Sequence, residues 1–336
     1  MEPVVIARDC TRVGVVVRDM EKAIDFYSQT FGWGPWDRFY AKYPPDTGTT
    51  VTLRGKPVSY EGPRALVKLG EIMFEFIEPH GESCLTEFLA SNSGGLHHLG
   101  FDVDDLSGAI AKLEKAGISP LEAEKDENGK YRWAYVSVLE ATGSNIVIEL
   151  AQRPRLVEPA KRYSRVFMAS SERPLVVTQG CNHIGVVNRD MEKDKEFFSR
   201  IFGWAPWDLG RQNHTKRVKG DGVTLRGEPC EFEGDRFHFR LGQLYIEFEE
   251  TPHGKSMQTE FLDSNSGGLL YCMFHVDDAL EAIANLEKAG IGVPFLQAVQ
   301  NKQGKYTNVH TGTQEFTGTN LVVGVAPHSA IETPTE

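Results

Sequence analysis

The sequence contains few cysteines, no long apolar run and no excess of basic residues. Its five cysteines are scattered over 336 residues without a CxxC pair, so we expect reduced thiols and no disulfide framework. No apolar stretch is long enough to span a bilayer, and Met1-Glu2-Pro3 does not resemble the start of a signal peptide, so we expect a cytoplasmic protein. A formal net charge of -11 argues against binding to nucleic acid or a membrane surface.

The sequence is instead rich in internal repetition. Residues 94–105 read GGLHHLGFDVDD, and residues 267–278 read GGLLYCMFHVDD. Apolar and polar residues alternate in the first copy, which is typical of a half-buried strand. The alternation places His98 on the face of Gly100, and it places His97 on the packed face with Leu99. The two copies differ in chemistry, because Tyr271 occupies the place of His98.

A second repeat opens each half of the chain. Residues 12–20 read RVGVVVRDM and residues 183–191 read HIGVVNRDM, and each stretch predicts a strand that ends at a helix-capping Asp. Three further strands are predicted after each helix, in the first case around Thr50–Leu53, Ala65–Leu69 and Glu71–Glu78. The same order recurs later in each half. The sequence therefore predicts an α+β fold of four βαβββ modules, at residues 10–80, 95–152, 181–252 and 268–326.

These modules divide the chain into two predicted domains. The first domain covers residues 1–152 and the second covers residues 180–327. Residues 153–179 contain several prolines and arginines and are predicted to be a linker, and residues 328–336 are predicted to be a polar tail.

Four βαβββ modules with His or Glu on their first and last strands resemble the vicinal oxygen chelate superfamily, which includes glyoxalase I, methylmalonyl-CoA epimerase and extradiol dioxygenases. Phe-Gly-Trp after the first helix, Gly-Leu-His-His at 95–98 and Ile-Val-Ile-Glu-Leu at 146–150 carry the resemblance. It implies that two modules form a cupped sheet around one divalent metal ion, with a ligand from the first and last strand of each module. Methylmalonyl-CoA epimerases carry a further Glu on the second strand of their first module, whereas residues 49–53 and 222–225 contain no acid.

The resemblance assigns a pair of ligand positions to each module. The second and third modules keep ligand residues at both positions, namely His98 with Glu149 and His183 with Glu247. The first and fourth modules are degraded, because their pairs are Arg12 with Glu75 and Tyr271 with Gly324. Arg does not lose its proton in proteins, and Gly has no ligand atom.

The residues leave two module pairings open. Pairing within halves gives Glu75, His98 and Glu149 in one site and only His183 and Glu247 in the other. Pairing across the halves gathers His98, Glu149, His183 and Glu247 around one metal ion and leaves a degraded pseudo-site of Arg12, Glu75, Tyr271 and Gly324. We favour the second arrangement, because it sorts every loss into one site. As a simpler alternative for Glu75, an ion pair with Arg12 would account for its place.

Imidazole and carboxylate ligands suit a divalent ion such as Zn, Ni, Co, Mn, Mg or Fe, which polarises a carbonyl or enediolate oxygen. Glu149 and Glu247 are the predicted catalytic residues, one taking a proton beside that oxygen and the other returning one. Tyr131 and Arg132, after a Gly-Lys turn, are predicted substrate contacts.

We therefore expect a metal-dependent isomerase, epimerase or lyase that acts on a small molecule, as a monomer or homodimer. An Fe(II)-dependent ring-cleaving dioxygenase and a metal-free protein that binds or sequesters a small molecule are the alternatives.

Overall fold

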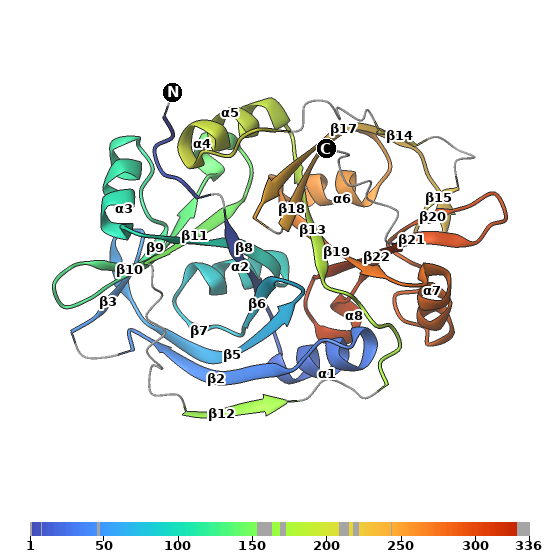
Figure 1. Ribbon diagram of the computed structural model, residues 1–336, viewed down its shortest axis with the longest axis horizontal. Helices are drawn as coiled ribbons and strands as arrows, with labels where there is room; N and C mark the ends of the chain where they lie inside the picture. Colours follow the sequence, from blue (N-terminus) through green and yellow to red (C-terminus); the bar gives the residue numbers. More distant parts are fainter. Residues whose placement is uncertain are drawn as a thin grey trace.

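In the computed structural model, the described residues are 2–7, 9–45, 48–152, 163–168, 173–207, 215–217, 222–242 and 244–327. The predicted linker lies in part, and the predicted tail entirely, outside these ranges. The described residues form two curved mixed sheets with helices (Figure 1), so the predicted α+β fold of βαβββ modules is confirmed. Across these ranges, no helix is long and apolar enough to cross a membrane.

The first sheet combines the first and second predicted modules with one strand, at Tyr163–Met168, that lies within the predicted linker. Its strands lie in the spatial order β12 (Tyr163–Met168), β2 (Trp36–Tyr43), β5 (Tyr60–Leu69), β6 (Ile72–Ile77), β1 (Cys10–Val16), β8 (Gly95–Val103), β11 (Val147–Gln152), β10 (Tyr131–Ser137), β9 (Glu122–Lys125), β3 (Thr50–Leu53) and β4 (Lys56–Val58), and β7 (His80–Gly81) pairs with β5.

The second sheet repeats this plan with the third and fourth modules. Its spatial order is β14 (Thr215–Arg217), β17 (Phe232–Leu241), β18 (Leu244–Gly254), β13 (Cys181–Asn188), β19 (Gly268–Val276), β22 (Val322–Pro327), β21 (Tyr306–Gly312), β20 (Gln297–Gln300), β15 (Val223–Leu225) and β16 (Glu228–Pro229).

Two features of the first module were predicted incorrectly. The second strand of the module is β2, which was not predicted, and it pairs antiparallel with β5. Thr50–Leu53 does form a strand, but β3 pairs with β9 at the far edge of the sheet, in the second module. The second strand of the first module therefore does carry an acid, in contrast to residues 49–53. This acid is Asp37, which lies opposite Leu66.

The helices are α1 (Met20–Phe31), α2 (Cys84–Asn92), α3 (Leu106–Lys115), α4 (Leu139–Thr142), α5 (Met191–Phe202), α6 (Met257–Ser264), α7 (Ala279–Lys288) and α8 (Gln314–Thr317). Asp19 and Asp190 cap α1 and α5 by accepting hydrogen bonds from the N–H groups of Lys22 and Lys193, as the sequence predicts.

The two halves share one hydrophobic core. The Trp33 ring, after α1, lies 4.7 Å from Tyr27 in its own half and 4.8 Å from Phe274 in the second half. Helix α1 also lies beside α8, where the rings of Phe26 and Phe316 stack at 5.1 Å (Figure 1). Because the shared core covers the helix-bearing face of both sheets, each sheet keeps its opposite face for a separate site.

The segments that lead into β1 and β13 cross between the halves. The N–H of Val5 donates to Ile201 O at the end of α5, and the N–H of Val176 donates to Thr30 O at the end of α1, both at 2.8 Å. This reciprocal exchange ties each half to the other, in addition to their shared core.

One buried hydrogen bond between the halves offers a direct test of this packing. The Ser144 hydroxyl donates to Asp194 Oδ2 at 2.8 Å, where Asn188 Nδ2 donates as well. We expect Ser144→Ala to lower the free energy of unfolding by about 1 kcal/mol, because the buried carboxylate loses one of its donors. Urea unfolding measures this loss. Ser91→Ala, on the exposed end of α2, is the control and should change stability by less than about 0.5 kcal/mol.

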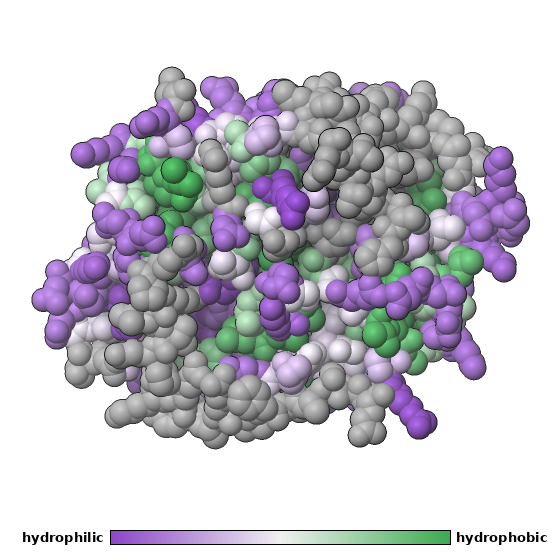
Figure 2. All heavy atoms as spheres, viewed as in Figure 1, coloured by the Kyte–Doolittle hydropathy of each residue, from purple (hydrophilic) through white to green (hydrophobic). Residues whose placement is uncertain are grey.

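Hydrophilic residues gather on the two hairpins at the ends of the long axis, β9–β10 and β20–β21 (Figures 1 and 2). These hairpins contain the matching Gly-Lys-Tyr loops at 129–131 and 304–306.

Candidate metal centre

The first sheet brings one group of potential metal ligands together on the face opposite α1 and α3. One ligand atom each from Glu75 on β6, His98 on β8 and Glu149 on β11 lies within 4.8 Å of the other two. Arg12 projects from β1 into the same group, and all four side chains are buried. We call these four residues the first site.

Strand register explains why the first site forms within one half. Strand β1 runs antiparallel to β8 with Gly14 opposite His98, and β11 runs parallel to β8 with Glu149 opposite Gly100. A Cβ at Gly14 would lie 1.9 Å from His98 Cε1, so the glycine leaves the space that the imidazole occupies. Gly14 is thus the local sequence signal for pairing between the first and second modules.

The predicted pairing across the halves is therefore wrong. Strand β13 pairs with β18 and β19 of its own half, so His183 and Glu247 lie in the second sheet. His98 and Glu149 lie in the first sheet. The four residues do not form one centre, and Glu149 and Glu247 do not flank one ion as the predicted catalytic pair.

Two ion pairs hold the glutamates of the first site. Arg12 Nε donates to Glu149 Oε2 at 2.8 Å and lies 3.9 Å from Glu75 Oε2. Arg64, on β5, donates to Glu75 Oε1 at 2.6 Å. The predicted pair of Arg12 with Glu75 is thus present, but Arg64 is the nearer partner of Glu75. Arg64 was not predicted, although its place two residues before Leu66, which pairs with Glu75, puts it on the same face.

Charge compensation controls the ionisation of Glu149. Burial raises the pKa of Glu149, but the charge of Arg12 and the neighbouring His98 outweigh it and lower the pKa to about 2. His98 Nε2 is 3.6 Å from Glu149 Oε2 and has no hydrogen-bond partner in the part of the chain that the structure describes. A buried imidazole nitrogen between two carboxylates is a fitting metal ligand.

His97 differs from its prediction. A β-bulge skips His97 in the pairing of β1 with β8, where Gly14 pairs with His98 and Val15 with Leu96. His97 consequently lies beside the first site, with Nδ1 3.0 Å from His98 Nδ1. Burial and the charge of His98 lower the pKa of His97 well below its ordinary value, so His97 is neutral.

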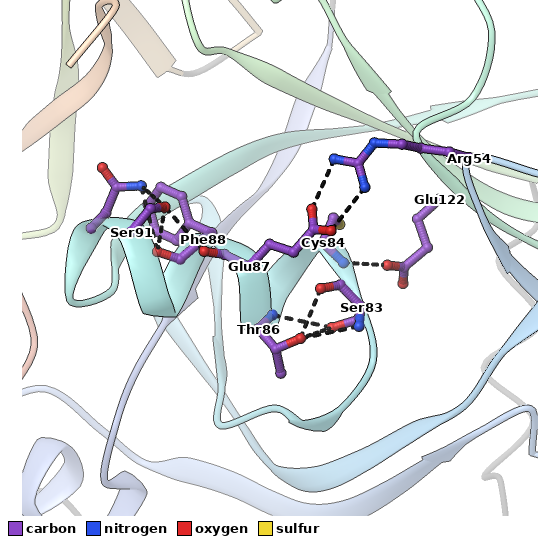
Figure 3. Close-up of polar contacts among 9 residues, drawn as sticks. Arg54, Ser83, Cys84, Thr86, Glu87, Phe88, Ser91 and Glu122 are labelled. Atoms are coloured by element: carbon purple, nitrogen blue, oxygen red, sulfur yellow. Dashed lines mark hydrogen bonds and ion pairs between the residues drawn. The ribbon is translucent and has the colours of Figure 1, made fainter. Parts of the chain in front are cut away.

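Helix α2 packs against the same face of the sheet and is anchored at several points (Figure 3). The N–H of Cys84 donates to the buried Glu122 at 2.7 Å. Arg54 makes a two-pronged pair with Glu87, at 2.9 and 2.8 Å. These contacts anchor the helix against that face.

The predicted substrate contacts do not reach the first site together. Tyr131 lies before a bulge in β10 and packs against the helix-side core, and Arg132 pairs with Glu124 at 3.1 Å. Tyr135, two residues beyond Trp133, is the β10 residue that contacts the site, with its ring 4.8 Å from that of His98.

The second sheet carries different chemistry at the equivalent positions, which we call the second site. His183 Nε2 lies 3.3 Å from Glu247 Oε2, and Tyr271 occupies the His98 position. His310 on β21 lies opposite Gly324 on β22, just as Tyr135 on β10 lies opposite Glu149 on β11. The first half thus has histidine on β8 and tyrosine on β10, whereas the second half has tyrosine on β19 and histidine on β21. Only the strand register reveals this exchange.

Internal partners fill the second site. The Tyr271 hydroxyl lies 2.6 Å from Glu247 Oε2 and 2.5 Å from Glu249 Oε1. The hydroxyl has one hydrogen and can donate only one of these two hydrogen bonds. One of the two carboxyl groups must therefore supply the hydrogen of the second bond. Burial and the charge of Glu247 raise the pKa of Glu249. Burial also opposes ionisation of Glu247, but Arg236 and His183 outweigh it and lower the pKa of Glu247, so Glu249 is the carboxyl that holds a proton more readily. Arg236 pairs with Glu247 at 2.7 Å. Gly324 leaves this site without the ligand that Glu149 supplies in the first.

The two matching sheets and the buried ligand positions define the class of protein. A family model for the Glyoxalase/Bleomycin resistance protein/Dioxygenase superfamily matches residues 11–135 and 182–307, and the chain belongs to this superfamily.

Individual relatives are similar to parts of the chain. Mitochondrial methylmalonyl-CoA epimerase from Mus musculus is 34% identical over 122 residues, which are 35% of this chain and 60% of the mouse protein. Ethylmalonyl-CoA/methylmalonyl-CoA epimerase from Cereibacter sphaeroides is 27% identical over 145 residues, covering 42% of this chain and 94% of that protein. The chain matches 56% of the length of the Homo sapiens methylmalonyl-CoA epimerase.

Among solved structures, a mutant of 4-hydroxymandelate synthase from Streptomyces coelicolor superimposes with a TM-score of 0.57 at 14% identity, covering 95% of this chain and 92% of that chain. This similarity shows a shared fold.

Proposed function

We propose that the first site is the centre of a metal-dependent isomerase, epimerase or lyase that transfers a proton next to a carbonyl or enediolate oxygen of a small molecule. The convergence of Glu75, His98 and Glu149 within 4.8 Å carries this proposal. One imidazole and two carboxylates fit a divalent first-row ion and leave coordination positions for substrate.

The side chains suggest a division of roles. A divalent ion held by Glu75, His98 and Glu149 would supply Lewis-acid polarisation of the substrate oxygen. Glu75 and Glu149 are the two carboxylates of this group and would take and return the proton. Arg12 keeps Glu149 ionised, and the burial of the site excludes competing water. The similarity to epimerases of methylmalonyl-CoA and ethylmalonyl-CoA supports acidity next to a thioester carbonyl as the chemistry to test first.

The ligand set favours this reaction over oxygen chemistry. Ring-cleaving dioxygenases of the non-haem type hold Fe(II) with two His and one carboxylate. The first site offers one His and two carboxylates in the described residues. The cytoplasmic location stays a prediction, and metal analysis of variants tests the predicted ligand roles of His183 and Glu247 against the first site.

Metal content of the purified protein, measured for the parent, Glu75→Ala and His183→Ala, is the first test. We expect about one ion per chain in the parent and in His183→Ala, and a large loss in Glu75→Ala. Loss in His183→Ala with retention in Glu75→Ala would place the centre in the second sheet. No ion in any of the three would favour the metal-free binding protein.

Proton transfer is tested separately. Methylmalonyl-CoA and ethylmalonyl-CoA are incubated with metal-loaded protein in D₂O, and deuterium at the carbon between the carbonyls is measured by mass spectrometry. We expect incorporation that depends on Glu75 and Glu149. Oxygen consumption with a catechol panel, without deuterium incorporation, would support the dioxygenase alternative instead.

A further inference from the structure

We infer that Arg12 binds an anionic substrate oxygen beside the metal ion and so makes the first site selective for carboxylate-bearing substrates. This inference rests on the proposed function. It gives a role to Arg12, which stands at a position where the family pattern expects a metal ligand.

In the described part of the chain, one N–H-bearing nitrogen of Arg12 is left without an acceptor. Its side chain is buried, with 7% of the residue exposed, and Nε is used by Glu149. Arg12 Nη2 has no hydrogen-bond partner among the described residues, and its distance of 3.7 Å to Asp102 Oδ1 exceeds a hydrogen bond. A buried guanidinium N–H without an acceptor is costly, so an acceptor from a ligand is favoured there.

The position of Arg12 also places its guanidinium next to the ligand group. Arg12 lies on the first strand at the place where His183 lies in the second half. It therefore points at the group formed by Glu75, His98 and Glu149 from the side that a fourth ligand would occupy. A substrate oxygen bound to the ion would lie next to the guanidinium. The planar fork of Arg suits the two oxygens of a carboxylate.

The charges around the ligand group favour an anionic ligand as well. In the metal-free site, Arg12 and Arg64 balance Glu75 and Glu149. A divalent ion would add two positive charges beside the guanidinium of Arg12. Nearby acids offset that charge in part, namely Asp102, Glu122 and Glu124. An oxygen placed between the ion and the guanidinium is bound more strongly when it is anionic, because charges in a buried site are weakly screened. The expected substrate class is thus a small molecule with a carboxylate adjacent to a second oxygen function.

The test measures binding of oxalate, a two-oxygen dianion, to the Co(II)-loaded protein by calorimetry and by the change in the cobalt absorption spectrum. We expect Arg12→Met to keep about one cobalt per chain and to bind oxalate about 10- to 100-fold more weakly. Arg12→Lys keeps the charge but not the fork and should fall between the parent and Arg12→Met. Arg226→Met, which removes an exposed guanidinium paired with Glu260 in the second half, is the matched control and should bind oxalate like the parent.

Thermal unfolding of each variant checks that the fold is retained. Unchanged oxalate affinity in folded, cobalt-loaded Arg12→Met would overturn the inference. A parent that binds no cobalt would overturn the proposed function. If the parent binds no cobalt but binds oxalate in a way that depends on Arg12, the result supports the arginine as the anion site. If the parent binds neither cobalt nor oxalate, both the proposed function and the inference about Arg12 are overturned.

Discussion

Glu149→Gln is expected to lower the free energy of unfolding of the metal-free protein by about 3 kcal/mol at pH 7 and to abolish metal binding. Glu149 is buried and accepts a 2.8 Å hydrogen bond from Arg12 Nε. Removing one charge of a buried pair leaves the other uncompensated, and such losses are commonly about 3–5 kcal/mol. Arg12 retains only the longer contacts, at 3.9 Å to Glu75 and 3.7 Å to Asp102. Urea unfolding and metal analysis on the same samples measure both effects.

Glu247→Gln is the matched control for this experiment. Glu247 is equally buried and pairs with Arg236 at 2.7 Å, so its loss should destabilise the protein by a similar amount. It lies in the second sheet, however, and should leave the metal content at the parent value. Metal loss in both variants would show that general destabilisation removes the ion. Metal retention in Glu149→Gln would contradict the ligand role of Glu149.

Much of the fold was predictable because both halves repeat local signals. An apolar strand, a capping Asp and an apolar helix face specify each module start with little help from distant residues, and Asp19 and Asp190 behave as predicted. Strand β2 was missed because Trp36–Tyr43 has no clear alternation of buried and exposed residues: its central residues are all half-buried. Helices α2 and α6 were also missed, since each is short and the sequence around them is polar.

The site was predictable in its residues but not in its grouping. Strand parity correctly places Glu75, His98 and Glu149 on one face, because side-chain direction is a local property. Which modules pair depends on distant contacts, and counting ligand losses led to the wrong pairing. The spatial signal was nevertheless present in the sequence as Gly14 and Gly185. Each leaves room for the ring on the neighbouring strand, His98 in the first sheet and Tyr271 in the second.

The pH dependence of stability provides a second large effect with a defined sign. Burial opposes ionisation of Glu149, but Arg12 and His98 lower its pKa in the folded protein from 4.5 to about 2. A lowered folded-state pKa contributes stability that is complete above the unfolded value and is lost as pH falls through the folded value. The shift corresponds to about 3 kcal/mol at pH 7. We expect the stability difference between the parent and Glu149→Gln to fall to roughly half by pH 3, as measured by urea unfolding of metal-free samples.

Glu249→Gln should show the opposite trend. Burial and Glu247 raise the pKa of Glu249, so ionising this group in the folded protein costs free energy as pH rises. Replacing it with a neutral amide removes that cost, and the free energy of unfolding of the variant should rise relative to that of the parent as pH rises above 4.5, the ordinary carboxyl pKa. Opposite slopes for the two variants would identify Glu149 as the carboxylate held ionised by Arg12 and Glu249 as the one held protonated beside Tyr271. Parallel slopes would contradict this assignment, because a general acid effect on the fold acts on both variants in the same direction.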